Sequence, residues 1–213
     1  MKNTLLAVGF GLSLSVLVSA APIDCNSMSN LQQYLDQSAL GGCMVQDKLF
    51  TNFTYAGGGT ESASQVSVSA TLASVPGIDI HGFTFVPKAV WTSDFTIGYT
   101  IGVIPPSGSV IVAALDQINV GPLSNAASVV STKGNGQVYT LDQTAGVTQS
   151  SLFAPVTSLS SSTTATIPAG AFLISLEEQY TQRLGPEVPE PATVTMLAGG
   201  LLGLLLIGRR LAA

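Results

Sequence analysis

The chain has 213 residues and a formal net charge of −5, with 46% hydrophobic and only 9% charged residues. All 12 acidic residues lie between residues 21 and 190, together with only four of the 7 basic ones. A charge-poor, acidic surface of this kind repels phosphate backbones, which argues against nucleic acid as a partner. The central part of about 170 residues is long enough for one domain with a sizeable core.

The N-terminus has the three parts of a secretory signal peptide. Lys2 supplies a positive charge, residues 5–18 form an apolar core, and Val18-Ser19-Ala20 offers the small residues that a signal peptidase reads. We expect cleavage after Ala20, or alternatively after Ala21, so that residues 1–20 are removed. A retained anchor is the other interpretation, but the apolar core is short for a membrane span.

Two cysteines, Cys25 and Cys43, lie near the start of the mature chain. In an exported protein they are expected to pair as a disulfide. A metal site is the alternative, but two cysteines and one distant histidine fall short of a structural zinc set.

The segment between the cysteines predicts one short helix. Ser27 or Ser29 can cap its start, and Gly41-Gly42 can end it. Apolar residues recur within it at helical spacing, namely Met28, Leu31, Tyr34 and Leu35.

After Phe50 the hydrophobic pattern changes to a period of two, which indicates strands with one buried face. The alternation is clearest over residues 66–72, 95–103 and 172–176. Further strand candidates are residues 50–55, 78–86, 110–120, 126–132, 137–142 and 151–160. Lys133-Gly134-Asn135-Gly136 predicts a hairpin turn between two of them. Many short strands at this spacing predict a mainly β domain, an antiparallel β-sandwich or jelly roll with one short N-terminal helix.

A Ser/Thr-rich run at residues 157–166 is open to three interpretations. Its composition is compatible with a glycosylated or a disordered patch. Leu159, Ala165 and Ile167 are equally compatible with an edge strand.

Signals for catalysis in the body of the chain are weak. His81 is the only histidine, and no serine has a G-x-S-x-G setting, so we interpret His81 as a hydrogen-bonded or solvent-facing strand residue. Glu177 and Glu178 are adjacent and must face opposite sides of a strand, which predicts one rim residue and one solvent residue. Nothing in the sequence indicates that the strand-associated aspartates converge: Asp79, Asp94, Asp116 and Asp142. We therefore predict no catalytic residue, no cofactor and no metal site.

Three aromatic residues could stack on sugar rings if they were exposed: Trp91, Tyr99 and Tyr139. Because strands are enriched in aromatic residues, packing in the core is the preferred interpretation. Tyr99 in particular is in register with the apolar face of its strand.

The last 26 residues contain three parts in a fixed order. The motif Val188-Pro189-Glu190-Pro191 comes first. Residues 192–208 follow as an uncharged apolar stretch, which as a helix reaches roughly 25 Å and is a marginal transmembrane span. Arg209 and Arg210 come last, and the positive-inside rule keeps them cytoplasmic.

This order resembles the PEP-CTERM sorting signal of Gram-negative bacteria, which membrane proteases called exosortases recognise. A looser resemblance to the N-terminal region of many PEP-CTERM proteins rests on scattered positions: Leu31, Tyr34, Gly42-Cys43, Asp47, Phe50, Asn52-Phe53 and Tyr55. The resemblance implies an address and not an activity. It implies a precursor held in the inner membrane by its C-terminal helix, processing by an exosortase, and delivery to the cell surface or an extracellular matrix near exopolysaccharide.

The predicted organisation is a signal peptide (1–20), an extracellular β-domain (21–183), a linker with the sorting motif (184–191), a transmembrane sorting helix (192–208) and a basic cytoplasmic end (209–213). The favoured function is that of a non-enzymatic surface or matrix protein with a structural or adhesive role. The alternative is a carbohydrate-binding module that uses exposed aromatic and amide side chains. A third hypothesis is a glycoside hydrolase-like enzyme, which requires two carboxylates facing each other in a cleft.

Overall fold

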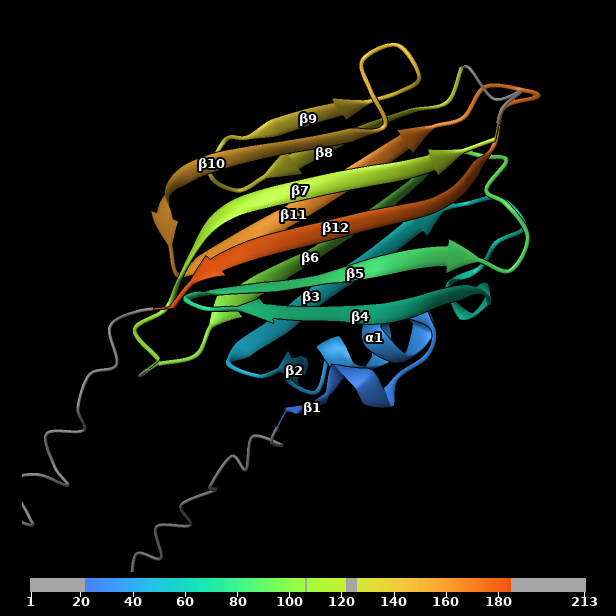
Figure 1. Cartoon of the computed structure of the whole chain (residues 1–213). Coiled ribbons are helices and arrows are strands. Elements are labelled where there is room, and N and C mark those ends of the chain that lie inside the picture. The colour runs from blue at the N-terminus through green and yellow to red at the C-terminus, as the bar shows by residue number, and fades with distance from the viewer. Residues whose placement is uncertain (1–21, 106, 122–125, 185–213) are drawn as a thin grey trace, which may run out of the picture.

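The computed structural model describes residues 22–105, 107–121 and 126–184, which form two β-sheets packed face to face with an α-helix beside them (Figure 1). The prediction of a mainly β sandwich with one short helix is confirmed. The signal peptide, the sorting motif and the apolar segment 192–208 lie outside the described residues. Within the described ranges, none of the helices has the length and apolar character that a membrane span requires.

The first sheet has seven strands in the order β1-β2-β3-β6-β11-β8-β9. Their bounds are β1 (Ile23–Asp24), β2 (Cys43–Val45), β3 (Lys48–Gly57), β6 (Phe95–Val103), β11 (Ser158–Thr166), β8 (Ser128–Lys133) and β9 (Val138–Leu141). The second sheet has five strands in the order β10-β7-β12-β5-β4. Their bounds are β10 (Thr148–Val156), β7 (Val110–Val120), β12 (Leu173–Arg183), β5 (Ile78–Pro87) and β4 (Val66–Val75). Neighbouring strands are antiparallel except for β1 and β2, which are parallel.

The helix α1 (Leu31–Ser38) packs against β3 and β4, one strand from each sheet, and buries Leu31 and Tyr34. Its predicted start is wrong by a short distance, because the cap is Asn30 and neither Ser27 nor Ser29. Asn30 and Gln33 bond to each other's backbone and so form a capping box. Two short 3₁₀ helices flank this region, η1 (Cys25–Ser27) and η2 (Ala63–Gln65).

The predicted disulfide between Cys25 and Cys43 is confirmed. Their Cα atoms are 5.0 Å apart and both side chains are buried. The Tyr34 hydroxyl donates a hydrogen bond of 2.9 Å to the Cys25 carbonyl oxygen, which joins α1 to the bridge. The disulfide therefore holds the N-terminal segment, the helix and strand β2 together.

Aromatic rings dominate the core between the sheets. Phe83 of β5 lies at their centre, with ring centroids 4.6 to 6.0 Å from those of its neighbours. These neighbours are Tyr34, Phe50, Phe53, Phe85 and Tyr99. Tilted and edge-to-face contacts at such distances are the favoured geometry for aromatic pairs, so this cluster binds the two sheets to each other and to α1.

Several predicted elements match the structure closely. The strands predicted at residues 95–103 and 110–120 coincide with β6 and β7. The predicted turn joins β8 to β9, with the Gly136 N–H donating to the Lys133 carbonyl at 2.9 Å. The strand predicted at residues 172–176 is β12, which continues to Arg183 and so includes both glutamates.

The prediction of a single strand over residues 151–160 is wrong. The segment belongs to β10 and β11, which lie in different sheets. The chain crosses between the sheets at Thr157, whose carbonyl oxygen accepts the N–H of Val103. A bulge and Pro155 mark the end of β10, consistent with the confinement of proline to edges and bulges.

The Ser/Thr-rich run is neither disordered nor an edge strand, because β11 pairs with β6 on one side and β8 on the other. Alternate residues of β11 are buried, including Ser161 and Thr163. The intervening hydroxyl groups are exposed on the outer face, at Ser158, Ser160, Ser162, Thr164 and Thr166. An uninterrupted period of two, with hydroxyl groups on both faces, explains why composition alone suggested disorder.

Removal of the disulfide should lower the stability of the domain without changing its fold. The bridge closes a loop with a sequence separation of 18 residues. On the chain-entropy model, the double variant Cys25→Ser/Cys43→Ser should lose about 3 kcal/mol of unfolding free energy. Guanidinium denaturation measures the loss, and alkylation of the unreduced wild type should find no free thiol. Stoichiometric labelling of the unreduced protein would contradict the assignment.

Candidate functional site

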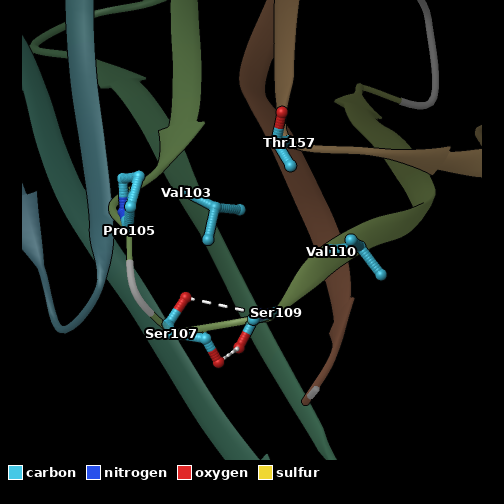
Figure 2. Close-up of a pocket in the computed structure, with 7 residues that line it drawn as sticks. Val103, Pro105, Ser107, Ser109, Val110 and Thr157 are labelled. Carbon is cyan, nitrogen blue, oxygen red and sulfur yellow. Dashed lines mark hydrogen bonds between the residues drawn. The ribbon is translucent and has the colours of Figure 1, made fainter. Parts of the chain in front are cut away.

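The end of the sandwich where β6 leads to β7 contains a small cavity (Figure 2). Its volume is about 390 Å³, and it is lined by Val103, Pro105, Ser107, Gly108, Ser109, Val110 and Thr157. Two hydrogen bonds of 3.4 Å between Ser107 and Ser109 hold the loop, one from backbone N–H to Oγ and one from Oγ to the carbonyl. A mainly apolar cavity with a few hydroxyl groups suits a small molecule or side chain with an apolar part.

A charged cluster lies beside this cavity. Lys48 pairs with Val103 across the β3–β6 ladder, and its buried ammonium contacts the carboxylate of Asp47. The other carboxylate oxygen of Asp47 accepts a hydrogen bond of 3.0 Å from Gln182 Nε2. The cluster thus connects β3 of one sheet to β12 of the other.

The protonation states of this ion pair follow from its surroundings. Burial raises the pKa of Asp47, but hydrogen bonding to Lys48, the charge of Lys48 and hydrogen bonds from Gln182 and Ser107 outweigh it and hold the pKa below its ordinary value. Burial lowers the pKa of Lys48, although Asp47 and Asp79 oppose this. Asp47 is therefore a carboxylate at neutral pH. Ser107 links it to the lining of the cavity.

His81 belongs to the same cluster, and its predicted environment is wrong. The side chain is fully buried on β5, and neither ring nitrogen has a hydrogen-bond partner. Burial lowers the pKa of His81 to about 4, and the charge of Lys48 adds to this effect. The opposing contributions of Asp47, Asp79 and Gln182 are smaller. The Gln182 amide approaches the ring closely enough to affect its pKa but does not satisfy either nitrogen. His81 is thus a neutral imidazole at neutral pH.

The buried imidazole should make the fold sensitive to acid. Its folded pKa of about 4 lies below its ordinary value of 6.5, so the unfolded chain binds a proton first as the pH falls. The contribution of neutral His81 to the free energy of unfolding is fully present above pH 6.5. It is lost as the pH falls towards 4, by about 3 kcal/mol in total. In His81→Leu this decline should be absent, so the difference in unfolding free energy between variant and wild type should change across that window. Parallel pH profiles for the two proteins would contradict the assignment.

A second polar cluster lies deeper between the sheets and is centred on Lys133. Its ammonium is 2.9 Å from Asp116 Oδ1 and 3.3 Å from Glu178 Oε2, and all three side chains are fully buried. Hydroxyl groups complete the coordination of Glu178: Ser161 donates at 2.7 Å, Tyr180 donates at 3.2 Å, and Thr163 donates to the other oxygen. Lys133 and the Ser/Thr residues come from one sheet, whereas Asp116, Glu178 and Tyr180 come from the other.

This cluster corrects two expectations. Glu177 and Glu178 do face opposite sides of β12, but Glu178 is a core residue and not a rim or solvent residue. Asp116 converges with Glu178, although no sequence pattern indicated that these two side chains would meet. The other strand-associated aspartates are placed elsewhere: Asp79 pairs with Ser74 and Gln182 along the ladders, Asp94 accepts the N–H of Ile167, and Asp142 accepts the N–H of Thr144.

The charges of the Lys133 cluster depend on one another. Burial lowers the pKa of Lys133, but Glu178, Tyr180 and Asp116 outweigh it and raise the pKa well above its ordinary value. Burial raises the pKa of Glu178, but Lys133 and the hydroxyl groups lower it overall. Burial and the neighbouring Glu178 raise the pKa of Asp116. A carboxylate pair arranged in this way, with an ammonium between the two groups and closed to solvent, links the two sheets and does not form an open cleft.

Removing the ammonium alone should be costly. Lys133→Met leaves buried carboxylates without their partner, and breaking such a pair typically costs about 3–5 kcal/mol of unfolding free energy. The charge-free triple variant Lys133→Met/Asp116→Asn/Glu178→Gln should recover most of that loss. Guanidinium denaturation followed by the fluorescence of Trp91, the single tryptophan, measures both. A triple variant as unstable as the single one would show that charge is not the cause.

The three aromatic residues considered for sugar stacking are buried. Trp91 is fully enclosed, donates from its indole nitrogen to the Tyr55 hydroxyl at 3.1 Å, and lies 4.2 Å from Phe95 between ring centroids. Tyr99 belongs to the core cluster around Phe83, and the Tyr139 hydroxyl contacts Ser151 at 2.6 Å. The interpretation as core residues is confirmed, and none of the three faces solvent.

Four members of the buried clusters were not predicted from the sequence as site residues: Asp47, Lys48, Lys133 and Gln182. The burial of the two lysines could have been predicted from strand alternation. Lys48 lies two residues from Phe50 and Lys133 lies four residues from Val129, so each lysine is on the same buried face of its strand as that apolar residue. Within residues 22–105, 107–121 and 126–184, no group of three or more histidine, cysteine or acidic side chains could hold a metal ion.

Comparisons with known proteins give no family for the chain. No protein-family model matches it, and no curated protein is significantly similar in sequence. Among solved structures, FLHE aligns with 61% of this chain and 97% of its own at 10% identity, with a TM-score of 0.29. TmCBM61 in complex with β-1,4-galactotriose aligns with 60% of this chain and 92% of its own at 12% identity, with a TM-score of 0.26. An exo-β-1,3-galactanase from Phanerochaete chrysosporium aligns with 62% of this chain and 29% of its own at 18% identity, with a TM-score of 0.20. Likenesses this low establish neither a shared topology nor a shared activity.

Proposed function

We propose that the protein is an exported, non-enzymatic domain of the cell surface or extracellular matrix, sorted by an exosortase. The observation that carries the proposal is the disulfide between Cys25 and Cys43, because disulfides form and persist mainly in oxidising compartments outside the cytoplasm. The signal-peptide pattern at residues 1–20 and the sorting motif Val188-Pro189-Glu190-Pro191 agree with that compartment. The partners of the precursor are an exosortase-type protease and, through residues 192–208, the inner membrane.

A structural or adhesive role linked to exopolysaccharide fits the surface of the domain. The outer face of β11 carries five exposed hydroxyl groups and no charge. Such a face can exchange hydrogen bonds with a neutral polysaccharide at many weak points, without a deep binding pocket.

The alternative of a carbohydrate-binding module ranks second. Trp91, Tyr99 and Tyr139 are buried, so a sugar-stacking platform built from them is not available. A glycoside hydrolase-like enzyme ranks third, because the carboxylates that do meet, Asp116 and Glu178, are closed to solvent around Lys133.

The sorting motif provides the test. A plain membrane anchor needs only apolarity and flanking charge, whereas a protease signal needs a specific sequence with a rigid Pro-x-Pro backbone. In the native host the mature protein should therefore lack residues 192–213. The variant Pro189→Ala/Glu190→Ala should retain them and accumulate at full length in the membrane. Intact mass and cell fractionation measure both outcomes.

A matched control lies three residues upstream, where Pro186-Glu187 repeats the same dipeptide outside the motif. Pro186→Ala/Glu187→Ala should be processed like the wild type. If wild type and both variants keep the tail and fractionate alike, the segment is a plain anchor and the sorting proposal is wrong.

A further inference from the structure

The four edge strands of the sandwich are protected to different extents. Strand β1 has only two residues. The free edge of strand β9 is occupied at Thr140 by the side chain of Gln149. The Gln149 amide accepts a hydrogen bond from the Thr140 N–H at 3.1 Å and donates one to the Thr140 carbonyl at 2.6 Å. Strand β10 carries Pro155 and a bulge. Short length, proline, bulges and blocking side chains are the usual means by which proteins prevent edge-to-edge pairing.

Strand β4, at the margin of the five-stranded sheet in Figure 1, is protected over only its first half. There the segment before α1 lies alongside it, and the N–H of Val68 donates to the Ser29 carbonyl at 3.1 Å. An isolated bridge between Asn30 and Ser67 extends this contact. Beyond Ser69, no described element pairs with this edge.

The direction of the free backbone groups follows from this contact. Val68 points its N–H away from β5, and the β4–β5 register continues without a shift to Val75. In an antiparallel ladder, successive residues point alternately towards and away from the partner strand. The N–H and C=O groups of Ala70, Leu72 and Ser74 therefore point outwards from the sheet.

The side chains of this edge offer no obstacle to pairing. Residues 70–75 contain no charge and no proline. Leu72 is 46% and Val75 is 56% exposed, so apolar surface accompanies the free backbone groups. Leu72 lies opposite His81 in the ladder, on the face of the sheet that is turned towards the core.

From these observations we infer that the free edge of β4 is an interface between two copies of this chain. Residues 70–74 of one copy pair antiparallel with the same residues of the other about a two-fold axis near Leu72, and two five-stranded sheets become one continuous sheet. A second copy is the fitting partner because a two-fold contact requires a self-complementary surface. An uncharged antiparallel strand meets that condition, and pairing through it brings no like charges of this acidic chain together. This interface is independent of the proposed sorting route.

The test uses the full chain, purified in detergent and studied by light scattering coupled to size-exclusion chromatography over a wide range of concentrations. Wild type should reach the mass of a dimer and go no further. Leu72→Lys places a charge at the axis, and Leu72→Pro removes an outward N–H without breaking the β4–β5 ladder; both should be monomeric. Leu152→Lys is the matched control, because Leu152 is 82% exposed on the other edge of the same sheet, and it should remain dimeric.

Two further measurements make the outcome decisive. Trp91 fluorescence and near-ultraviolet circular dichroism should show that each variant remains folded. Hydrogen exchange should show the amides of Ala70, Leu72 and Ser74 protected in the dimer and exposed after dilution. A wild type that stays monomeric at every concentration would overturn the inference, and so would a dimer that survives Leu72→Lys, since its contact would lie elsewhere.

Discussion

The sandwich closes around an ammonium group held between two carboxylates. Lys133 enters from one sheet, and Asp116 and Glu178 enter from the other. Burying any one of these charges alone would cost several kcal/mol, and their mutual attraction offsets that cost only when the geometry is good. The two sheets are therefore constrained to one relative position, at which the three groups and the hydroxyl donors Ser161 and Thr163 meet.

The second cluster applies the same constraint near the end of the domain. Lys48 belongs to β3 of the seven-stranded sheet and Asp47 to the turn just before it, whereas Gln182 and His81 belong to the five-stranded sheet. Here the imidazole contributes by remaining neutral, because burial disfavours its charged form and the positive charge of Lys48 adds to that effect. The aromatic and aliphatic core residues pack the two sheets together, whereas the polar clusters determine the alignment of the sheets. Non-directional packing alone would tolerate a slipped register more easily than ion pairs and hydrogen bonds do.

Much of the fold could be predicted from local pattern, but the clusters could not. A period of two between glycine and proline breaks identifies β6 and β7 to the residue, and two cysteines in a chain expected to be exported predict the disulfide. The pattern fails in β5, where Ile78 and Ile80 face outwards while Asp79 and His81 share the inward parity of Phe83. It also fails at residues 151–160, where a continuous apolar and hydroxyl pattern hides a change of sheet. The partners of Lys133 could not be found, because sequence alternation assigns a residue to a face but does not say which distant strand faces it.

The position of β12 determines how a pulling force would enter the domain. It is the last strand of the described fold, and it lies between β5 and β7 with antiparallel ladders on both sides. Just after it, the N–H of Leu184 is held by the carbonyl of Gly77 at the β4–β5 turn. Tension applied through the C-terminal segment would act along the axis of a central strand. Two rows of hydrogen bonds would then have to shear together instead of opening one at a time, so β12 would resist such a force more strongly than an edge strand with a single ladder.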